Sequence, residues 1–492
     1  MPTQIPFDFE TDLFINGAYV PSASGARFTT PDPATGKPLA SIASASEADV
    51  NNAVENALEA FNSGSWSLLE PQERGAVLLK FATLIERELD ELAILEAVDA
   101  GKPITDCKEF DFPDVLNSIR FYAEAADKFF GKVVPTGETT LGLIVREPVG
   151  VVGAVLPWNF PAAMLAWKLA PALAAGNSIV VKPPELSSLT TLRLAQLALD
   201  AGVPAGVFNV VPGRGEIAGK ALGLHPKVAA ISFTGSEEVG RQFLQYSAAS
   251  NLKNVTLEMG GKSAQIVMPS WAGDLETVAT DLIEAAFGNN GQNCTAGSLI
   301  LVHEELKDEL LGRLKTVAES KKVGLPLDPE SDYSALIEES ALTRVLEFID
   351  EAHDEGATII TGGERVLEHT GGWFVSPTIV TDVEPTSRIA QEEIFGPVTV
   401  VLGFSNEDEA IELANGTKYG LAGTVWTKDL AQANRMAHRF NAGTVSINGY
   451  SEGDIRTPFG GFKQSGFGGK DNGFEALEQF TNQKTIWINA DY

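Results

Sequence analysis

The sequence predicts an α/β chain with two parallel-sheet domains, and three observations lead to this fold class. The chain has 492 residues, a length for which two or three domains are expected. In its middle third, short apolar runs alternate with helical stretches, a pattern typical of a parallel sheet covered by helices on both faces. After the glycines of Met259–Gly261 the same alternation begins again, so we expect a second sheet domain from there.

The first array begins with the apolar run Val151–Leu156, which ends at "PWNFP". Further strands are expected at Ser178–Lys182, Phe208–Val211, Val228–Phe233 and Val255–Glu258. Helices are expected at Ala162–Ala175, Leu189–Ala201 and Ile217–Leu222, and after "TGSEEVG".

The second array repeats the pattern less regularly. Helices are expected near Leu275–Phe287, Leu306–Glu319 and Ser340–Glu355, and strands near Leu299–Val302, Thr358–Thr361, Val398–Leu402 and Gly443–Ile447. A last strand candidate, Lys484–Asn489, has no obvious partner. It pairs either at a subunit interface or back onto the body.

Composition argues against several function classes. The formal net charge is −30, which argues against nucleic acid as a partner, because nucleic-acid binding needs a basic face. No apolar run reaches about 18 residues, the length that indicates a membrane span, and the acidic N-terminus does not resemble a secretory signal. Two cysteines, Cys107 and Cys294, do not form a disulfide framework, so we expect a cytoplasmic protein in a reducing compartment.

Cys294 lies in the polar, glycine-rich stretch "GQNCTAGS" (291–298). Such surroundings are unusual for a packed thiol, whereas Cys107 has no comparable neighbours and is expected to be a bystander. The nearest histidine in the sequence is His303, so no local base is evident. Cys294 is therefore a candidate nucleophile that must be activated by a residue from elsewhere in the chain.

A repeated array of strands and helices often binds a nucleotide at its strand ends. The stretch "GRGEIAG" (213–219) misses the G-x-G-x-x-G spacing by one residue, and "GSEEVG" (235–240) has only two glycines. Each is either a phosphate-binding turn or an ordinary turn before a helix. The second stretch opens a helix, where free N–H groups and the Ser236 hydroxyl suit a pyrophosphate.

The strand Ser178–Lys182 runs into "KPPE", which places Lys182 and Glu185 at one strand end. Both side chains can bond to ribose hydroxyls, or both are surface charges. A carboxylate at this point repels a 2′-phosphate, so the ribose interpretation favours NAD over NADP.

Seven motifs occur in a fixed order along the chain. They are "PWNFP" (157–161), "KPPE" (182–185), "FTGS" (233–236), "LEMGGKS" (257–263), "GQNCTAGS" (291–298), "EEIFGPV" (392–398) and "TPFGGFKQSG" (457–466). Together they resemble the NAD(P)-dependent aldehyde dehydrogenase superfamily. The resemblance runs from "FINGAYV" near the start to "KTIWIN" at the end, and seven motifs at family spacing are highly specific.

This resemblance implies two Rossmann-like parallel-sheet domains, one cofactor-binding and one catalytic, with a small β oligomerisation element. The NAD-binding domain comprises 1–127 and 146–259, and the catalytic domain comprises 260–465. The oligomerisation element comprises 128–145 and 480–492. Members of the superfamily form homodimers or homotetramers through such an element, which gives the last strand its partner.

The resemblance also implies the catalytic residues. Cys294 is the nucleophile that attacks an aldehyde; hydride then leaves for the nicotinamide, and water hydrolyses the resulting thioester. Glu258, in "LEMGGKS", matches the general base, although by itself it is an ordinary strand-end glutamate. Asn159 matches the donor that stabilises the oxyanion together with the Cys294 backbone N–H, although by itself it is a turn asparagine.

Glu393 and Phe395, in "EEIFGPV", match residues that hold the nicotinamide ribose and pack beside the nicotinamide. The cofactor contacts implied by the resemblance are Trp158, Lys182, Glu185, Gly235, Ser236, Glu393 and Phe395. NAD is the expected cofactor, with NADP less favoured, and no metal site is expected.

One segment departs from the family pattern. Many members have arginine followed by an acidic residue after "SGxG", and in some of them the acid takes part in a proton relay. This chain has Gly469 and Lys470 there. We therefore expect either that the relay is absent or that Glu258 works alone.

Substrate choice in the superfamily depends on the tunnel that leads to the cysteine. The motifs place around it Asp111, Asp114, Phe160, Met164, Trp167, Asn293, Thr295, Glu452, Asp454 and Phe459. Four of these residues are acidic and should attract an ammonium group, and Trp167, Phe160 and Tyr450 could pack against its methylenes. Alternatively the acids simply face solvent, or Arg456 neutralises one of them.

The "EGD" loop with "FKQSGFGG" is similar to the γ-glutamyl-γ-aminobutyraldehyde, aminoaldehyde and guanidinobutyraldehyde branch of polyamine breakdown. We therefore expect an ω-aminoaldehyde or a related polar aldehyde as substrate. The alternatives are a broad-specificity aliphatic or aromatic aldehyde dehydrogenase and a semialdehyde dehydrogenase. A cysteine acyl-transferase or a non-catalytic member fits less well, because neither explains the complete set of catalytic and cofactor residues.

Overall fold

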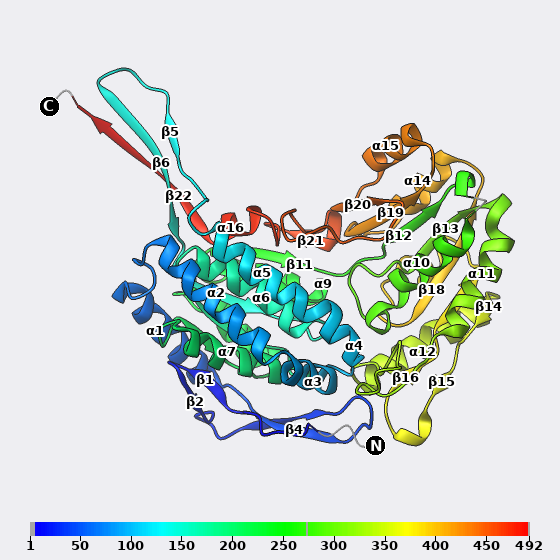
Figure 1. The fold of residues 1–492 in the computed structure, drawn as a ribbon, viewed down its shortest axis with the longest axis horizontal. Coiled ribbons are helices and arrows are strands. Elements are labelled where there is room, and N and C mark those ends of the chain that lie inside the picture. The colour runs from blue at the N-terminus through cyan, green and yellow to red at the C-terminus, as the bar shows by residue number, and fades with distance from the viewer. Residues whose placement is uncertain (1–4, 272–273, 491–492) are drawn as a thin grey trace.

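The computed structural model of the protein describes residues 5–271 and 274–490. Figure 1 shows two α/β parts and an arm that extends from one of them. The first part is built on an eight-stranded sheet with the order β2-β1-β9-β8-β7-β10-β11-β21. Its strands are β1 (Leu13–Ile15), β2 (Ala18–Val20), β7 (Val151–Val155), β8 (Ser178–Lys182), β9 (Phe208–Val210), β10 (Ala230–Thr234), β11 (Asn254–Glu258) and β21 (Gly466–Phe467).

Helices cover both faces of this first sheet. One core lies against α2 (Pro71–Arg87), α3 (Leu89–Ala100), α5 (Phe112–Ala125), α6 (Pro161–Ala174) and α7 (Leu189–Ala201), and the other lies against α1 (Glu47–Ser63), α8 (Lys220–Leu224) and α9 (Glu237–Ala248). Alternate residues of β7 pack into the two cores: Val152 and Ala154 belong to the first core, and Val151 and Val155 belong to the second. A strand buried on both faces must be apolar throughout, which explains the continuous apolar run.

The second part is built on a seven-stranded sheet with the order β14-β17-β18-β13-β12-β19-β20. Its strands are β12 (Ala264–Val267), β13 (Leu299–His303), β14 (Thr358–Thr361), β17 (Thr378–Thr381), β18 (Val398–Phe404), β19 (Ala422–Trp426) and β20 (Thr444–Ile447). They pair in parallel, except that β14 is antiparallel to β17. The helices of this part are α10 (Leu275–Phe287), α11 (Lys307–Ser320), α12 (Glu339–Asp354), α13 (Arg388–Gln391), α14 (Glu407–Asn415) and α15 (Leu430–Arg439).

The predicted α/β fold class with two parallel-sheet parts is confirmed. β11 ends at Glu258 and β12 begins at Ala264, so the chain passes from one sheet to the other between these two residues. The sequence patterns missed β12, β17 and β19, which are short and buried. The chain also returns to the first sheet late, because β21 pairs with the edge of β11.

The arm is a three-stranded antiparallel sheet that extends away from the body (Figure 1). Its strands are β5 (Lys132–Val134), β6 (Thr140–Pro148) and β22 (Thr481–Asn489). The last strand, which had no evident partner in the sequence, pairs with β6 along its whole length. Apolar side chains on the arm are exposed, among them Val133, Trp487 and Ile488.

The remaining elements are short. They are β3 (Arg27–Pro31) with β4 (Pro38–Ala43), β15 (Arg365–Val366) with β16 (Phe374–Val375), α4 (Ile104–Asp106), α16 (Glu475–Gln479) and two π-helical turns at Cys107–Asp111 and Gly215–Gly219. Within the described residues, every helix is too short or too polar to cross a bilayer.

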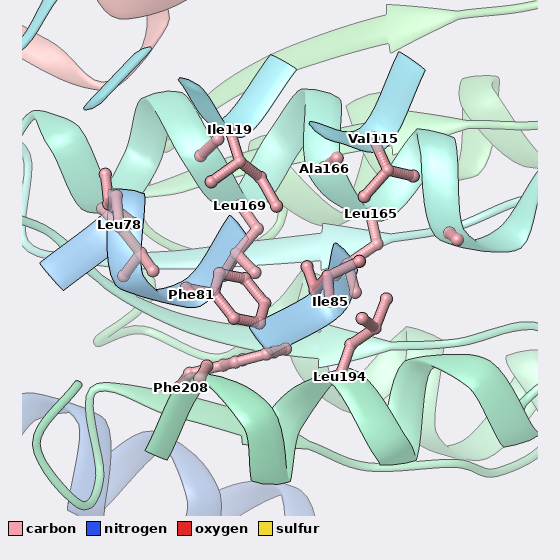
Figure 2. Close-up of a cluster of buried hydrophobic side chains, with 14 of the residues drawn as sticks. Leu78, Phe81, Ile85, Val115, Ile119, Leu165, Ala166, Leu169, Leu194 and Phe208 are labelled. Atoms are coloured by element: carbon pink, nitrogen blue, oxygen red, sulfur yellow. The ribbon is translucent and has the colours of Figure 1, made fainter. Parts of the chain in front are cut away.

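The largest core lies between the first sheet and the helices on one of its faces. Figure 2 shows Leu78, Phe81 and Ile85 of α2 among apolar side chains of α5, α6 and α7. Phe81 is 1 % exposed, whereas Leu79 on the same helix is 40 % exposed.

We predict that Phe81→Ala lowers the free energy of unfolding of this part by about 3–5 kcal/mol, because it leaves a cavity in a close-packed core. The matched control Leu79→Ala should change it by less than about 1 kcal/mol. Thermal and denaturant unfolding of both variants would measure the difference. Equal losses from the two substitutions would contradict this view of the core.

Candidate active site

A single cavity of about 960 Å³ is lined by residues from both parts of the molecule. Thr295 is the one predicted site residue outside its wall, and it is fully buried. The predicted site residues that line the cavity are Asp111, Asp114, Trp158, Asn159, Phe160, Met164, Trp167, Lys182, Glu185, Gly235, Ser236, Glu258, Asn293, Cys294, Glu393, Phe395, Glu452, Asp454 and Phe459.

Cys294 follows a tight turn that is shaped by three residues with positive φ. Asn289 and Asn290 have φ near 52° and 59°, and Gly291 has φ of 68°. A Cβ at Gly291 would collide with the carbonyl of Gly396, so glycine is required by both its conformation and its close approach. The turn thus packs the nucleophile loop directly against the segment that carries Glu393 and Phe395.

The thiol of Cys294 is surrounded by carboxylates. Burial raises its pKa well above the ordinary value, and the nearby carboxylates of Glu452, Glu393 and Glu258 raise it further. His303, the nearest histidine in the sequence, instead bonds to the backbone carbonyl of Ser405. The resting site therefore favours the protonated thiol.

Glu258 is the last residue of β11 and is 3 % exposed. Its Oε2 accepts a hydrogen bond from the Gly461 N–H at 3.3 Å, and its Oε1 is buried without a hydrogen-bond partner among the described residues. Burial raises the pKa of this carboxyl well above the ordinary value, and the charge of Asp471 adds to the rise. Lys168 and Lys470 act in the opposite direction.

Asp471 was missed by the sequence analysis. Its carboxylate forms a fully buried ion pair with Lys168 at 3.0 Å, and Lys168 also donates to the Ser232 hydroxyl at 3.1 Å. Asp471 thus stands one residue after the position at which the motif places the acid, and its charge contributes to the raised pKa of Glu258. Lys470 instead donates to the backbone carbonyls of Gly460 and Gly461, beside Glu258.

Asn159 is buried at the turn between β7 and α6. Its side-chain amide donates to the Gln292 carbonyl at 2.8 Å, two residues before Cys294. The backbone carbonyl of Asn159 accepts hydrogen bonds from Lys102 Nζ at 3.2 Å and from Asn289 Nδ2 at 3.0 Å. The second hydrogen of the Asn159 amide is not used by the bond to Gln292 and is available to a ligand in the cavity.

Two of the four tunnel acids are neutralised within the protein. Asp111 forms a buried ion pair with Lys102 at 2.5 Å, and the Lys102 ammonium also lies 3.9 Å from the centre of the Phe160 ring. Asp454 pairs with Arg456 on the exposed part of its loop, at 2.5 Å. The sequence could not show the first pair, because the two residues meet across a π-helical turn.

Asp114 and Glu452 have no cationic partner among the described residues. Asp114 accepts a hydrogen bond from the Trp167 indole at 2.7 Å, and burial with the charges of Glu452 and Asp111 raises its pKa to about 6. Trp167 packs edge-on against Phe459, with ring centroids 5.0 Å apart. The tunnel therefore combines an apolar wall with two unpaired carboxylates.

The other end of the cavity fits a dinucleotide. Ser236 caps the N-terminus of α9 and accepts a hydrogen bond from the Val239 N–H at 3.4 Å. The Thr234 hydroxyl is buried there without a partner among the described residues. Lys182 and Glu185 form an ion pair at 2.7 Å, and Glu185 also accepts from the Gly215 N–H at 2.7 Å. Helix N–H groups and this pair offer donors and acceptors for phosphate and ribose.

Between the two ends lie Glu393 and Phe395. Glu393 accepts a hydrogen bond from the Gly261 N–H at 2.9 Å, and burial raises its pKa to about 7. Phe395 has φ of 58°, a rare conformation for a bulky residue, and its ring packs edge-on against Trp158 at 5.2 Å. Such backbone strain is found preferentially at functional sites.

Comparisons with known proteins agree with this geometry. Residues 19–486 match the model of the aldehyde dehydrogenase family. The chain is 47 % identical to aminoacetaldehyde dehydrogenase of Pseudomonas aeruginosa over 483 residues, which are 98 % of this chain and 96 % of the relative. It is 46 % identical to the NADP/NAD-dependent aldehyde dehydrogenase PuuC of Escherichia coli, with 98 % and 96 % of the two chains covered.

Solved structures give the same result. The γ-glutamyl-γ-aminobutyraldehyde dehydrogenase of Burkholderia cenocepacia superposes with a TM-score of 0.96 at 49 % identity, with 98 % of this chain and 97 % of that chain covered. The indole-3-acetaldehyde dehydrogenase AldA of P. syringae, solved in complex with NAD+, superposes with a TM-score of 0.97 at 46 % identity and the same coverage. The chain described here belongs to the aldehyde dehydrogenase family.

Proposed function

We propose that this aldehyde dehydrogenase oxidises ω-aminoaldehydes to the corresponding acids with NAD+, through a thioester on Cys294. The observation that carries the proposal is the convergence of Cys294, Glu258 and Asn159 on one cavity that also holds two unpaired carboxylates. The cavity has an end that suits a dinucleotide and an end that suits a cationic aldehyde.

The reaction divides among three residues. The Cys294 thiolate adds to the aldehyde carbon, and the oxyanion receives hydrogen bonds from the Asn159 amide and the Cys294 backbone N–H. Bound NAD+ would supply the acceptor for the hydride that leaves this adduct. Glu258 then takes a proton from the water that hydrolyses the thioester, which releases the acid and restores the thiol.

The cofactor contacts are assigned to the opposite end of the cavity. Lys182 and Glu185 bind the adenosine ribose, Ser236 and Gly235 bind the pyrophosphate, and Glu393 binds the nicotinamide ribose. Trp158 and Phe395 line the nicotinamide. In this assignment 1–127 and 146–259 form the NAD-binding domain, and 260–465 form the catalytic domain.

The substrate class follows from charge. Asp111 and Asp454 are each balanced by a basic residue, so Asp114 and Glu452 supply the field that attracts an ammonium group. The names of two relatives, aminoacetaldehyde dehydrogenase and γ-glutamyl-γ-aminobutyraldehyde dehydrogenase, support an aldehyde that carries an amino group. A broad-specificity enzyme is the second candidate, because the indole-3-acetaldehyde dehydrogenase is comparably similar.

We predict that kcat/KM for 4-aminobutyraldehyde exceeds that for hexanal by at least about tenfold. Asp114→Asn should reduce this ratio by about tenfold, because it removes the charge and keeps an acceptor for the Trp167 indole. Asp454→Asn is the matched control, since Arg456 already balances that carboxylate. A tenfold preference for hexanal that Asp114→Asn does not alter would overturn the proposed substrate.

We predict that NAD is used in preference to NADP, because Glu185 repels a 2′-phosphate. Glu185→Gln should raise kcat/KM for NADP by about tenfold and leave the preference for the aldehyde unchanged. Parallel initial rates with the two cofactors would measure this. A wild-type KM for NADP at or below that for NAD would remove the role given to Glu185.

We predict that the pH dependence of thioester hydrolysis reports the charges around Glu258. The base must be ionised, so the rate rises with pH through the pKa of Glu258. Because the Lys470 ammonium lowers that pKa, Lys470→Met should raise it and move the rising limb to higher pH by about one unit. The plateau at high pH should be unchanged.

Single-turnover hydrolysis of the acyl-enzyme, measured across pH, would test the prediction. Lys470→Arg keeps the positive charge, so its hydrolysis rate should rise with pH over the same range as that of the wild type. If the hydrolysis rate of Lys470→Met rose with pH over the same range as that of the wild type, Lys470 would not influence the pKa of Glu258.

The arm suggests the assembly. We assign oligomerisation to 128–145 and 480–492, because apolar side chains such as Val133 and Trp487 are exposed there. A homodimer or homotetramer in a reducing cytoplasm is the form we propose. A monomer in sedimentation experiments would contradict the assignment.

A further inference from the structure

Glu452 contacts both residues that flank the nucleophile. Its carboxylate accepts hydrogen bonds from the Asn293 amide at 2.9 Å, from the Thr295 hydroxyl and from the Tyr450 hydroxyl at 2.7 Å. The Thr295 and Tyr450 hydroxyl oxygens also lie 2.7 Å from each other. The loop that carries Glu452 is therefore fastened to the chain on both sides of Cys294.

All of the hydrogen bonds to Glu452 come from neutral donors. They orient the carboxylate without cancelling its charge, so the negative charge acts on the thiol between Asn293 and Thr295. Glu452 and Tyr450 from this loop, Glu393 from the segment after α13 and Glu258 from β11 line the same cavity as Cys294. Burial and the carboxylates together raise the pKa of the thiol.

Asp114 lines the same cavity and is electrostatically coupled to Glu452, whose charge contributes to its raised pKa. Its bond to Trp167 places it on the apolar cluster of Trp167, Leu421 and Phe459, against which Met164 and Cys294 pack. A cation that binds to both carboxylates therefore lies close to the thiol and relieves their mutual repulsion.

We propose that the ammonium group of the substrate activates the nucleophile: bound at Asp114 and Glu452, it cancels the negative charge beside Cys294, so the thiol releases its proton to water more readily. This inference rests on the proposed aminoaldehyde function. In this proposal Glu452 controls the rate at which the Cys294 thiolate attacks the aldehyde, as well as the affinity for the substrate. A neutral aldehyde enters the same tunnel and leaves the thiol protonated.

Alkylation of Cys294 by iodoacetamide tests the idea without any aldehyde or cofactor. The full-length enzyme is alkylated at pH 7 with saturating n-propylammonium or with its neutral isostere n-propanol, and the modified cysteine is identified by peptide mass. We expect n-propylammonium to accelerate alkylation about tenfold relative to n-propanol, because one pKa unit changes the thiolate fraction tenfold. Equal rates, or slower alkylation with n-propylammonium, would overturn the proposal.

Glu452→Gln is the informative variant, since glutamine keeps the shape and a hydrogen-bond acceptor. Its alkylation should be about tenfold faster than that of the wild type without any additive, and n-propylammonium should change it less than twofold. An ammonium effect that persists in Glu452→Gln would overturn the role of Glu452. Asp454→Asn, in the same loop, should retain the full wild-type response.

The pH profile of alkylation separates electrostatics from a loosened loop. Loss of the Glu452 charge should move the pH profile of the alkylation rate to lower pH and leave the rate at its high-pH plateau unchanged. A displaced loop would change the plateau rate, and this result would count against the proposal. The test is also independent of the proposed substrate. A preference for hexanal over 4-aminobutyraldehyde would overturn the proposed function and leave the alkylation result standing.

Discussion

Backbone packs directly against backbone around Cys294, and this contact is the constraint on which the rest of the site depends. A Cβ at Gly261 would lie 2.5 Å from the Cys294 carbonyl, and one at Gly291 would collide with Gly396. Gly261 follows a strand of the first sheet, and Gly291 precedes a strand of the second. Only with side chains absent at both positions can Glu258, Cys294 and Glu393 reach one cavity.

The second constraint is the cost of burying charge. Lys168 with Asp471 and Lys102 with Asp111 are buried as ion pairs, which is how most interior charges are tolerated. Glu258, Asp114 and Glu452 have no such pair within 4 Å among the described residues. Of these, Glu258 and Asp114 have raised pKa values, and carboxyl groups with such shifts that line a cavity are candidates for a functional role. The cost of burying charge therefore affects the base Glu258, the substrate tunnel and the nucleophile Cys294 alike.

Much of the fold and of the site could be predicted because the evidence is local. Continuous apolar runs predicted β7, β8, β10 and β11, because a strand that is covered on both faces carries apolar side chains on both faces. Cys294 and Asn159 stand in short motifs that fix their neighbours. Asp471 could not be predicted in the same way, because its ion pair with Lys168 joins residues about 300 positions apart and is formed only in the folded chain.

The sequence by itself determined the α/β class, the family and the identity of the residues around the thiol, because each depends on periodicity or on a motif of a few residues. The tertiary structure decided the partner of β22 and which carboxylates stay unpaired. Asp111 and Asp114 are both aspartates and stand three positions apart, yet Lys102 forms an ion pair only with the first. Charge balance depends on distances in space, and the distance between Lys102 and Asp111 is set by the π-helical turn between them, which the sequence pattern does not reveal.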